Sequence, residues 1–137
     1  MYVTLILSIS TFVTENEIAK VVVDICFKIH RQYGPGLLES IYEELFCYEL
    51  TQRRIQHTRQ QIICLVHEGV NMGKAFRADV IIENKFITEL KSVEILIPKD
   101  FKQILSHLRI TKIKLGMLVN FNVALIKDGI HRIVNNL

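Results

Sequence analysis

Two opposite charges lie inside the most strand-like stretch of the chain, and this stretch constrains the fold more than any other. The sequence Phe86-Ile87-Thr88-Glu89-Leu90-Lys91-Ser92-Val93 contains β-branched and aromatic residues and has apolar neighbours, which predicts a β-strand. Because side chains alternate along a strand, Glu89 and Lys91 share one face. Burying charge is costly unless the charges are paired or bind a metal. The rest of the chain must therefore explain why these two residues are there.

Two helices are predicted before this strand. Thr14-Glu15-Asn16-Glu17 has the form of a capping box, and apolar residues then recur at three- and four-residue spacing as far as Tyr33. Gly34-Pro35-Gly36 ends this first helix. A second helix is predicted from about residue 37 to 53. Its expected buried face consists of Leu38, Ile41, Tyr42, Leu45 and Phe46.

Strands and one further helix complete the predicted order. Strands are expected at residues 61–67 and 75–83, and Glu83-Asn84-Lys85 is a tight turn into the strand that follows it antiparallel. A helix is then expected over 98–110 and a strand over 112–120. A closing hairpin with an Asp128-Gly129 turn is expected over 123–134. The order α-α-β-β-β-α-β-β indicates a mixed α/β (α+β) fold.

Length and composition favour a single folded domain over residues 14–137. The chain has 137 residues, of which 50% are hydrophobic and 23% charged, and this balance is typical of a globular protein rather than a disordered one. Residues 1–13 form an uncharged, apolar N-terminal extension, either an extra strand or a loosely attached leader. It lacks the basic region of a signal peptide and is too short to span a membrane, so no membrane association is expected.

Three cysteines without a CxxC pair indicate reduced thiols in a cytoplasmic protein, and Cys26, Cys47 and Cys64 are expected to be small core residues. The net charge of +3 is compatible with a polyanionic partner but does not establish one.

Asp79 adds a second carboxylate to the region of Glu89. The two residues are ten positions apart across a short turn, so both side chains can reach the same part of a two-stranded pair. Two carboxylates about 4 Å apart repel by roughly 4 kcal/mol at an effective dielectric constant of 20. A divalent cation would remove that repulsion, and oxygen ligands suit Mg²⁺ or Mn²⁺. Lys91 would then orient or deprotonate a water, or stabilise charge on a phosphate. Alternatively, Glu89 and Lys91 pair only with each other or with solvent at a sheet edge.

The Glu-x-Lys spacing alone carries little information, because the chain contains it twice. Glu83 and Lys85 lie in a polar turn and need no function, whereas Glu89 and Lys91 lie in an apolar strand. Glu39, in the first turn of the second predicted helix, is also ambiguous. An acidic residue there is favoured by the helix dipole, and it can equally belong to a site.

Several separate segments match motifs of a known family. They are residues 29–43, with Gly36, Glu39 and Tyr42 in the spacing GxxExxY, and residues 78–79, 88–93, 103–109 and 115–121. Over about residues 15–134 the chain resembles the GxxExxY proteins, a branch of the PD-(D/E)xK nuclease-like superfamily. The resemblance implies a restriction-endonuclease-like core, in which a central mixed β-sheet is flanked by helices.

The resemblance also implies a set of site residues. Asp79 and Glu89 would be metal ligands, with the Leu90 carbonyl between them, and Lys91 would be the catalytic lysine. Glu39 would reach the same site from its helix as a further metal ligand.

One motif of the relatives is only partly present. Gln103 matches the glutamine of a Q-x-x-x-Y motif, and it would orient Lys91 or a phosphate. His107 stands where the tyrosine is expected. Tyr42 lies on an apolar helix face, which favours a core position.

A group of basic residues near the predicted site points to nucleic acid as the partner, with DNA favoured over RNA. Such residues hold phosphates without reading sequence, although a solvated helix face has the same composition. A homodimer is compatible with the sequence. The residues of this group are Lys99, Lys102, Arg109, Lys112 and Lys114.

These observations predict a metal-dependent nuclease that uses Mg²⁺ or Mn²⁺. The catalytic residues would be Lys91, Glu89, Asp79 and Gln103. A second hypothesis is a catalytically inactive domain of the same fold that binds nucleic acid or a protein partner. A third is a structural protein with a surface Glu–Lys pair.

Overall fold

The computed structural model describes residues 13–137, so all of the predicted N-terminal extension except Val13 lies outside the described residues. Two helices precede a three-stranded segment, which is followed by a helix and two more strands. The elements are α2 (Glu15–Tyr33), α3 (Glu39–Gln52), β1 (His57–His67), β2 (Val70–Ile82), β3 (Phe86–Lys91), α4 (Pro98–Thr111), β4 (Leu115–Asn120), the 3-10 helix η1 (Ile126–Asp128) and β5 (Ile130–Val134).

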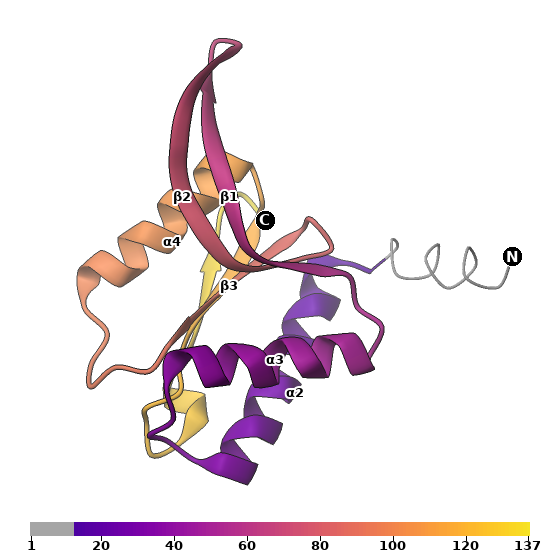
Figure 1. Ribbon diagram of the computed structural model, residues 1–137, viewed down its shortest axis with the longest axis vertical. Helices are drawn as coiled ribbons and strands as arrows, with labels where there is room; N and C mark the ends of the chain where they lie inside the picture. Colours follow the sequence, from indigo (N-terminus) through magenta and orange to yellow (C-terminus); the bar gives the residue numbers. More distant parts are fainter. Residues whose placement is uncertain (1–12) are drawn as a thin grey trace, which may run out of the picture.

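The five strands form one mixed sheet in the order β1-β2-β3-β4-β5. Neighbouring strands are antiparallel except β3 and β4, which are parallel and are joined through α4. Parallel neighbouring strands need such a crossover, because a tight turn reverses the chain direction and can join only antiparallel strands. The mixed sheet flanked by helices confirms the predicted fold class (Figure 1).

Alternation along the central strands divides the core between the two faces of the sheet. Phe86 and Leu90 of β3 pack with the buried residues of α2 and α3. Ile87 packs on the other face with Leu108 of α4. Gly116 of β4 leaves room for β3 and α4, because a Cβ there would lie 2.7 Å from the Ile87 carbonyl oxygen and 3.4 Å from the Leu108 side chain. On this face of the sheet Glu89 is buried beside α4, whereas Lys91 is half-buried.

The first helix agrees with its prediction, and the second agrees only in part. Thr14 accepts a hydrogen bond from the Glu17 amide, and the Glu17 carboxylate accepts one from Thr14, which completes the capping box. In α3 the predicted buried face was wrong at Leu38 and Ile41, which are 72% and 43% exposed. Leu38 precedes the helix as its N-cap, so it lies outside the helical periodicity that the prediction assumed.

The predicted closing hairpin was wrong in its first half. Residues 126–128 form η1 rather than a strand, and β5 pairs with β4 instead of with residues 123–127. Gly129 donates its backbone N–H to the Ile126 carbonyl, which closes the 3-10 turn. The segment is held against the end of β4, where the Asn120 amide donates to the Gly129 carbonyl.

The β1–β2 hairpin is longer than predicted and projects beyond the rest of the sheet (Figure 1). Cys64 lies on this projecting part and is exposed, contrary to the prediction of three core cysteines, whereas Cys26 and Cys47 are buried. Between residues 13 and 137, none of the helices combines the length and the apolar character that crossing a bilayer would require.

Candidate active site

Asp79 and Glu89 face each other where β2 begins to leave β3. The two strands pair at Val80 and Thr88, and one step further along this register brings Asp79 opposite Glu89. The pairing recorded for the two strands ends at this step, and Asp79 instead accepts a hydrogen bond from the Leu90 amide through Oδ2, at 3.0 Å. The side chain of Asp79 thus occupies the position of a strand partner, which fixes it beside Glu89.

The two carboxyl groups are hydrogen bonded to each other and are largely buried. Burial, and then the nearby Glu89 carboxylate, raise the pKa of Asp79 to about 7. Burial also raises the pKa of Glu89 to about 6, although the hydrogen bond to Asp79 and the charge of Lys91 act in the opposite direction. Both carboxyl groups therefore keep their protons to a higher pH than exposed carboxyl groups do.

Glu89 has a further partner on α4. The Nδ1 atom of His107 lies 3.1 Å from Oε1 of Glu89, and the imidazole stacks on Phe76 of β2 with ring centroids 3.7 Å apart. Burial lowers the pKa of His107. The position that departs from the expected tyrosine therefore contacts the site directly.

Lys91 ends β3 and is only half-buried. Its charge lowers the pKa of Glu89 and also that of His107, so the ammonium lies on the side of the sheet that carries both groups. The chain after Lys91 is fixed by the buried Asn120, whose side chain donates to the Val93 carbonyl and accepts from the Val93 amide. This clamp holds the end of β3 against the end of β4.

The GxxExxY segment shapes the loop before α3. Gly36 has φ +103°, a backbone conformation that glycine adopts readily. The Tyr42 hydroxyl donates to the Gly34 carbonyl at 2.6 Å and accepts from the Leu37 amide. Tyr42 is fully buried and stacks on Phe121, so the expectation of a core position is confirmed. The loop thereby sets the start of α3, where Glu39 lies.

Glu39 is exposed at the first position of α3. Its charge contributes to the raised pKa of Glu89, so it lies within electrostatic reach of the carboxylate pair. The Ser92 hydroxyl donates to the Leu37 carbonyl at 2.8 Å, which ties the residue after Lys91 to the loop before Glu39. One turn further along α3, Glu43 raises the pKa of Asp79.

Asp79 of β2 and Glu89 of β3 thus lie together beside Lys91, and Glu39 of α3 lies within electrostatic reach of Glu89. The family comparison agrees with the fold. A family model of the PD-(D/E)XK nuclease superfamily matches residues 16–133. The chain belongs to the PD-(D/E)XK nuclease superfamily. The searches of curated proteins and of solved structures each gave no match.

Gln103 is exposed on α4, one turn before His107. Its predicted part in the site stays a prediction. The basic residues divide between the two ends of the same helix: Lys99 and Lys102 are exposed at its start. At its other end Arg109, Lys112 and Lys114 line a hollow of about 400 Å³ together with Asn135 and Asn136.

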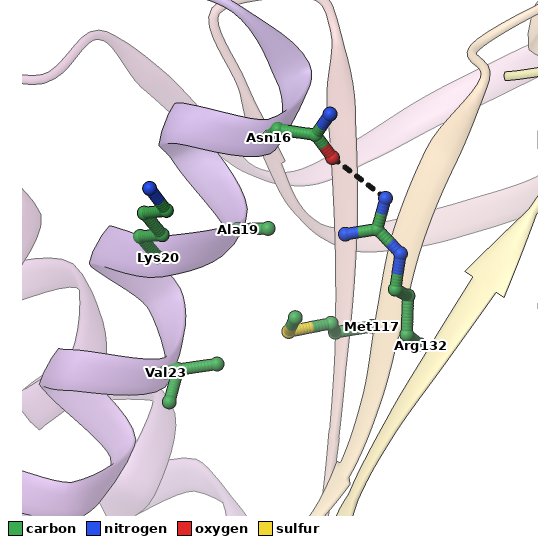
Figure 2. A pocket seen from close by; sticks show the side chains of 6 residues that line it. All are labelled: Asn16, Ala19, Lys20, Val23, Met117 and Arg132. Carbon is green, nitrogen blue, oxygen red and sulfur yellow. Dashed lines mark hydrogen bonds between the residues drawn. The ribbon is translucent and has the colours of Figure 1, made fainter.

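A different hollow of the nuclease domain lies away from the carboxylates, between α2 and the strands β4 and β5. Figure 2 shows Lys20 and Arg132 at this hollow, with Met117 on its sheet side. Arg132 donates to Oδ1 of Asn16 at 2.6 Å. None of the predicted site residues lines this hollow.

The carboxylates of the candidate site meet some of the requirements for binding a divalent cation. Two oxygen-bearing side chains that repel each other when ionised suit Mg²⁺ or Mn²⁺. However, no three His, Cys, Asp or Glu side chains within residues 13–137 form a group that could hold a metal. The acidic side chains that lie together are therefore those of Asp79 and Glu89.

Three residues near the site were not singled out as site residues from the sequence. His107 stands out in the sequence only as a departure from a motif, and neither Glu43 nor Gln60 stands out at all. Gln60 lies in β1 and donates to both Glu43 and Asp79. Gln60 and Gln61 are adjacent residues of the same type, and both have the sequence context of a solvent-facing glutamine. Nothing in the sequence therefore distinguishes Gln60 from Gln61.

Proposed function

We propose that the protein is a metal-dependent nuclease that hydrolyses phosphodiester bonds, with DNA favoured over RNA, and that it belongs to the GxxExxY branch of its superfamily. The observation that carries the proposal is the direct contact between Asp79 and Glu89 in a buried position beside Lys91. Burying two acidic groups in contact is unfavourable, and a cation between them would turn the arrangement into a favourable one.

The proposed ligands of Mg²⁺ or Mn²⁺ are Asp79, Glu89 and the Leu90 carbonyl, with Glu39 reaching in from α3. The Leu90 amide points toward Asp79, and the N–H and C=O groups of one strand residue point to the same side. The Leu90 carbonyl therefore lies on the side of Asp79. When bound, the cation would polarise the scissile phosphate and lower the pKa of a water.

Lys91 supplies the positive charge that offsets the charge developing on the phosphate, and it positions the attacking water. The half-buried location suits this role, because the ammonium stays accessible to substrate while its charge acts on Glu89. Gln103 orients Lys91 or a phosphate oxygen from the exposed side of α4.

The basic residues along α4 would hold the nucleic-acid backbone. Lys99 and Lys102 lie at the start of the helix, which follows β3 and its catalytic lysine by a short loop. Arg109, Lys112 and Lys114 line one hollow with two asparagine side chains and no acidic residue among its described lining. Such a set binds phosphates without reading bases.

The test is a cleavage assay with purified protein, Mg²⁺ or Mn²⁺, and single- and double-stranded DNA and RNA. Lys91→Ala and Asp79→Ala are expected to abolish cleavage. Lys85→Ala is the matched control, because Lys85 belongs to the other Glu-x-Lys segment and its ammonium contacts the Val13 carbonyl. Cleavage that persists unchanged in the Lys91 and Asp79 variants would refute the assignment.

A second candidate, a domain that binds nucleic acid or protein without cleaving, is favoured by one observation. Within residues 13–137 no three suitable side chains come together as a metal site. Calorimetry with Mg²⁺ and Mn²⁺ separates the two candidates. A cation affinity that disappears in Asp79→Ala supports the nuclease, and the absence of any affinity in the wild type supports the binding domain.

A further inference from the structure

The geometry points to Gln60 of β1 as a positioning residue for Asp79. This inference deepens the proposed function and depends on it. The side-chain nitrogen of Gln60 lies 3.3 Å from Oδ1 of Asp79 and 2.6 Å from Oε1 of Glu43. One amide group thus bridges a proposed metal ligand on the sheet and a carboxylate on the helix above it.

The register of the sheet places Gln60 directly beside Asp79. Arg59 pairs with Val80 and Gln61 pairs with Ala78, so Gln60 is opposite Asp79. Glu89 lies opposite Asp79 on its other side. Asp79 therefore stands between Gln60 and Glu89, in the row of residues that crosses the three strands at this point.

The backbone at Gln60 is unusual for a strand. Its φ is +51°, in the left-handed region that side chains other than glycine seldom occupy. Adjacent residues of a regular strand point to opposite faces, yet Arg59 and Gln60 both contact Glu43. The left-handed conformation permits this, because it turns the Gln60 side chain out of the regular alternation.

Arg59 completes the arrangement by fixing Glu43. Its guanidinium donates to Oε2 of Glu43 at 3.0 Å and to Oε1 of Glu44 at 2.9 Å. With Oε2 engaged by Arg59, the other oxygen of Glu43 is directed at Gln60. The chain of contacts from Arg59 through Glu43 and Gln60 ends on Oδ1 of Asp79.

The consequence for Asp79 is a fixed orientation of its carboxyl group. Oδ1 accepts from Gln60 and Oδ2 accepts from the Leu90 amide, so rotation of the group would break both hydrogen bonds. Side chains that donate hydrogen bonds to a metal ligand orient that ligand, and removing one weakens metal affinity about 10- to 100-fold. Gln60 therefore acts on metal affinity through Asp79 rather than on the substrate directly.

The strained backbone provides a variant that separates positioning from stability. Gln60→Gly removes the amide and also relieves the left-handed conformation, since glycine adopts it readily. Its melting temperature is expected to equal or exceed that of the wild type. Gln61→Gly is the matched control, because Gln61 is the next residue of the same strand and its side-chain oxygen accepts from Thr58.

The experiment titrates the 137-residue chain with Mg²⁺ by calorimetry and measures cleavage of DNA as a function of Mg²⁺ concentration. Gln60→Gly is expected to raise the half-saturating Mg²⁺ concentration about 10- to 100-fold, and saturating Mg²⁺ should restore its cleavage rate. Gln61→Gly should keep the wild-type Mg²⁺ dependence. This rescue at high Mg²⁺ would not be seen for a folding defect.

Two outcomes would overturn the inference, and they are distinguishable. If the wild type binds Mg²⁺ and Gln60→Gly shows the same affinity and the same Mg²⁺ dependence, Gln60 does not position Asp79. If the wild type neither binds Mg²⁺ nor cleaves, the proposed function fails and the role of Gln60 fails with it.

Discussion

The two Glu-x-Lys segments of the chain have the same spacing, but the fold uses them differently. Glu83-Asn84-Lys85 forms the turn between β2 and β3, with left-handed backbone at Glu83 and Asn84. Glu89-Leu90-Lys91 ends β3 beside Asp79. The comparison shows that the surroundings, and not the spacing, decide whether a carboxylate and an ammonium form a site.

Both charged side chains of the turn segment make hydrogen bonds to main-chain groups. Oε1 of Glu83 accepts from the Gln56 amide at 3.1 Å, and the Glu83 amide donates to the Gln56 carbonyl. Lys85 donates to the Val13 carbonyl at 2.8 Å. Glu83 is as buried as Glu89, at 9% and 8% exposed, so burial alone does not mark the active segment. Glu83 is held by main-chain groups of one neighbouring residue, whereas Glu89 lies beside a second carboxyl group, an arrangement that suits a cation.

The largest difference between the segments should appear on removing each glutamate. Glu89→Gln is expected to lower cleavage by about 100-fold or more, because it removes a charged ligand worth several kcal/mol in the transition state. Glu83→Ala should leave the cleavage rate near that of the wild type while lowering the free energy of unfolding by about 1–3 kcal/mol. Single-turnover cleavage and denaturant unfolding measure the two effects, and an equal loss of activity in both variants would remove the distinction.

The second prediction concerns the pH dependence of stability in the metal-free protein, measured in EDTA. The pKa of Asp79 is raised to about 7 and that of Glu89 to about 6, above their values in an unfolded chain. Between about pH 4 and pH 7 the native state therefore binds more protons than the unfolded state. The free energy of unfolding should therefore fall as pH rises through this window.

Asp79→Asn tests the origin of that slope, because it removes one of the two coupled carboxyl groups. Its free energy of unfolding should change less between pH 4 and pH 7 than that of the wild type. Adding Mg²⁺ at pH 8 should stabilise the wild type and leave Asp79→Asn nearly unchanged. A wild-type stability that rises over the same window would contradict the buried pair as its cause.

A third prediction concerns the partner of Glu89 on α4. His107→Phe keeps an aromatic ring against Phe76 but removes the nitrogen that lies 3.1 Å from Glu89. The half-saturating Mg²⁺ concentration is expected to rise about 10-fold, because an outer partner of a ligand is lost. Phe101→Leu on the same helix is a suitable control, since Phe101 contacts His131 of β5 instead. Unchanged Mg²⁺ dependence in His107→Phe would show that Glu89 is oriented without the imidazole.

The smallest effect is expected at the contact between the end of β3 and the loop before α3. Ser92→Ala removes the hydrogen bond to the Leu37 carbonyl and should lower the free energy of unfolding by about 1 kcal/mol. Cleavage should fall only a few-fold, because α3 remains folded without this hydrogen bond and still carries Glu39. Lys85→Ala removes a comparable hydrogen bond in the turn segment and should cost similar stability with no loss of cleavage. A larger loss of activity in Lys85→Ala than in Ser92→Ala would reverse the comparison.

Local rules were sufficient where the structure depends on near neighbours. The capping box of Thr14, the strand at residues 86–91 and the helix from Pro98 follow from spacing and local hydrogen bonding, and all are present. They failed at residues 123–127, which were predicted as a strand and instead lead into η1 (Ile126–Asp128). That outcome depends on contacts with the end of β4, which lie outside any local window.

The sequence by itself determined the fold class, the strand at residues 86–91 and the closeness of Asp79 to Glu89 across one short turn. Alternation and a single antiparallel turn fix these features, so they can be derived from the order of residues. Only the tertiary structure placed His107 on Glu89 and Gln60 on Asp79. The residues in these contacts are 18 and 19 positions apart in the sequence. The first contact depends on the packing of α4, and the second depends on the left-handed backbone at Gln60.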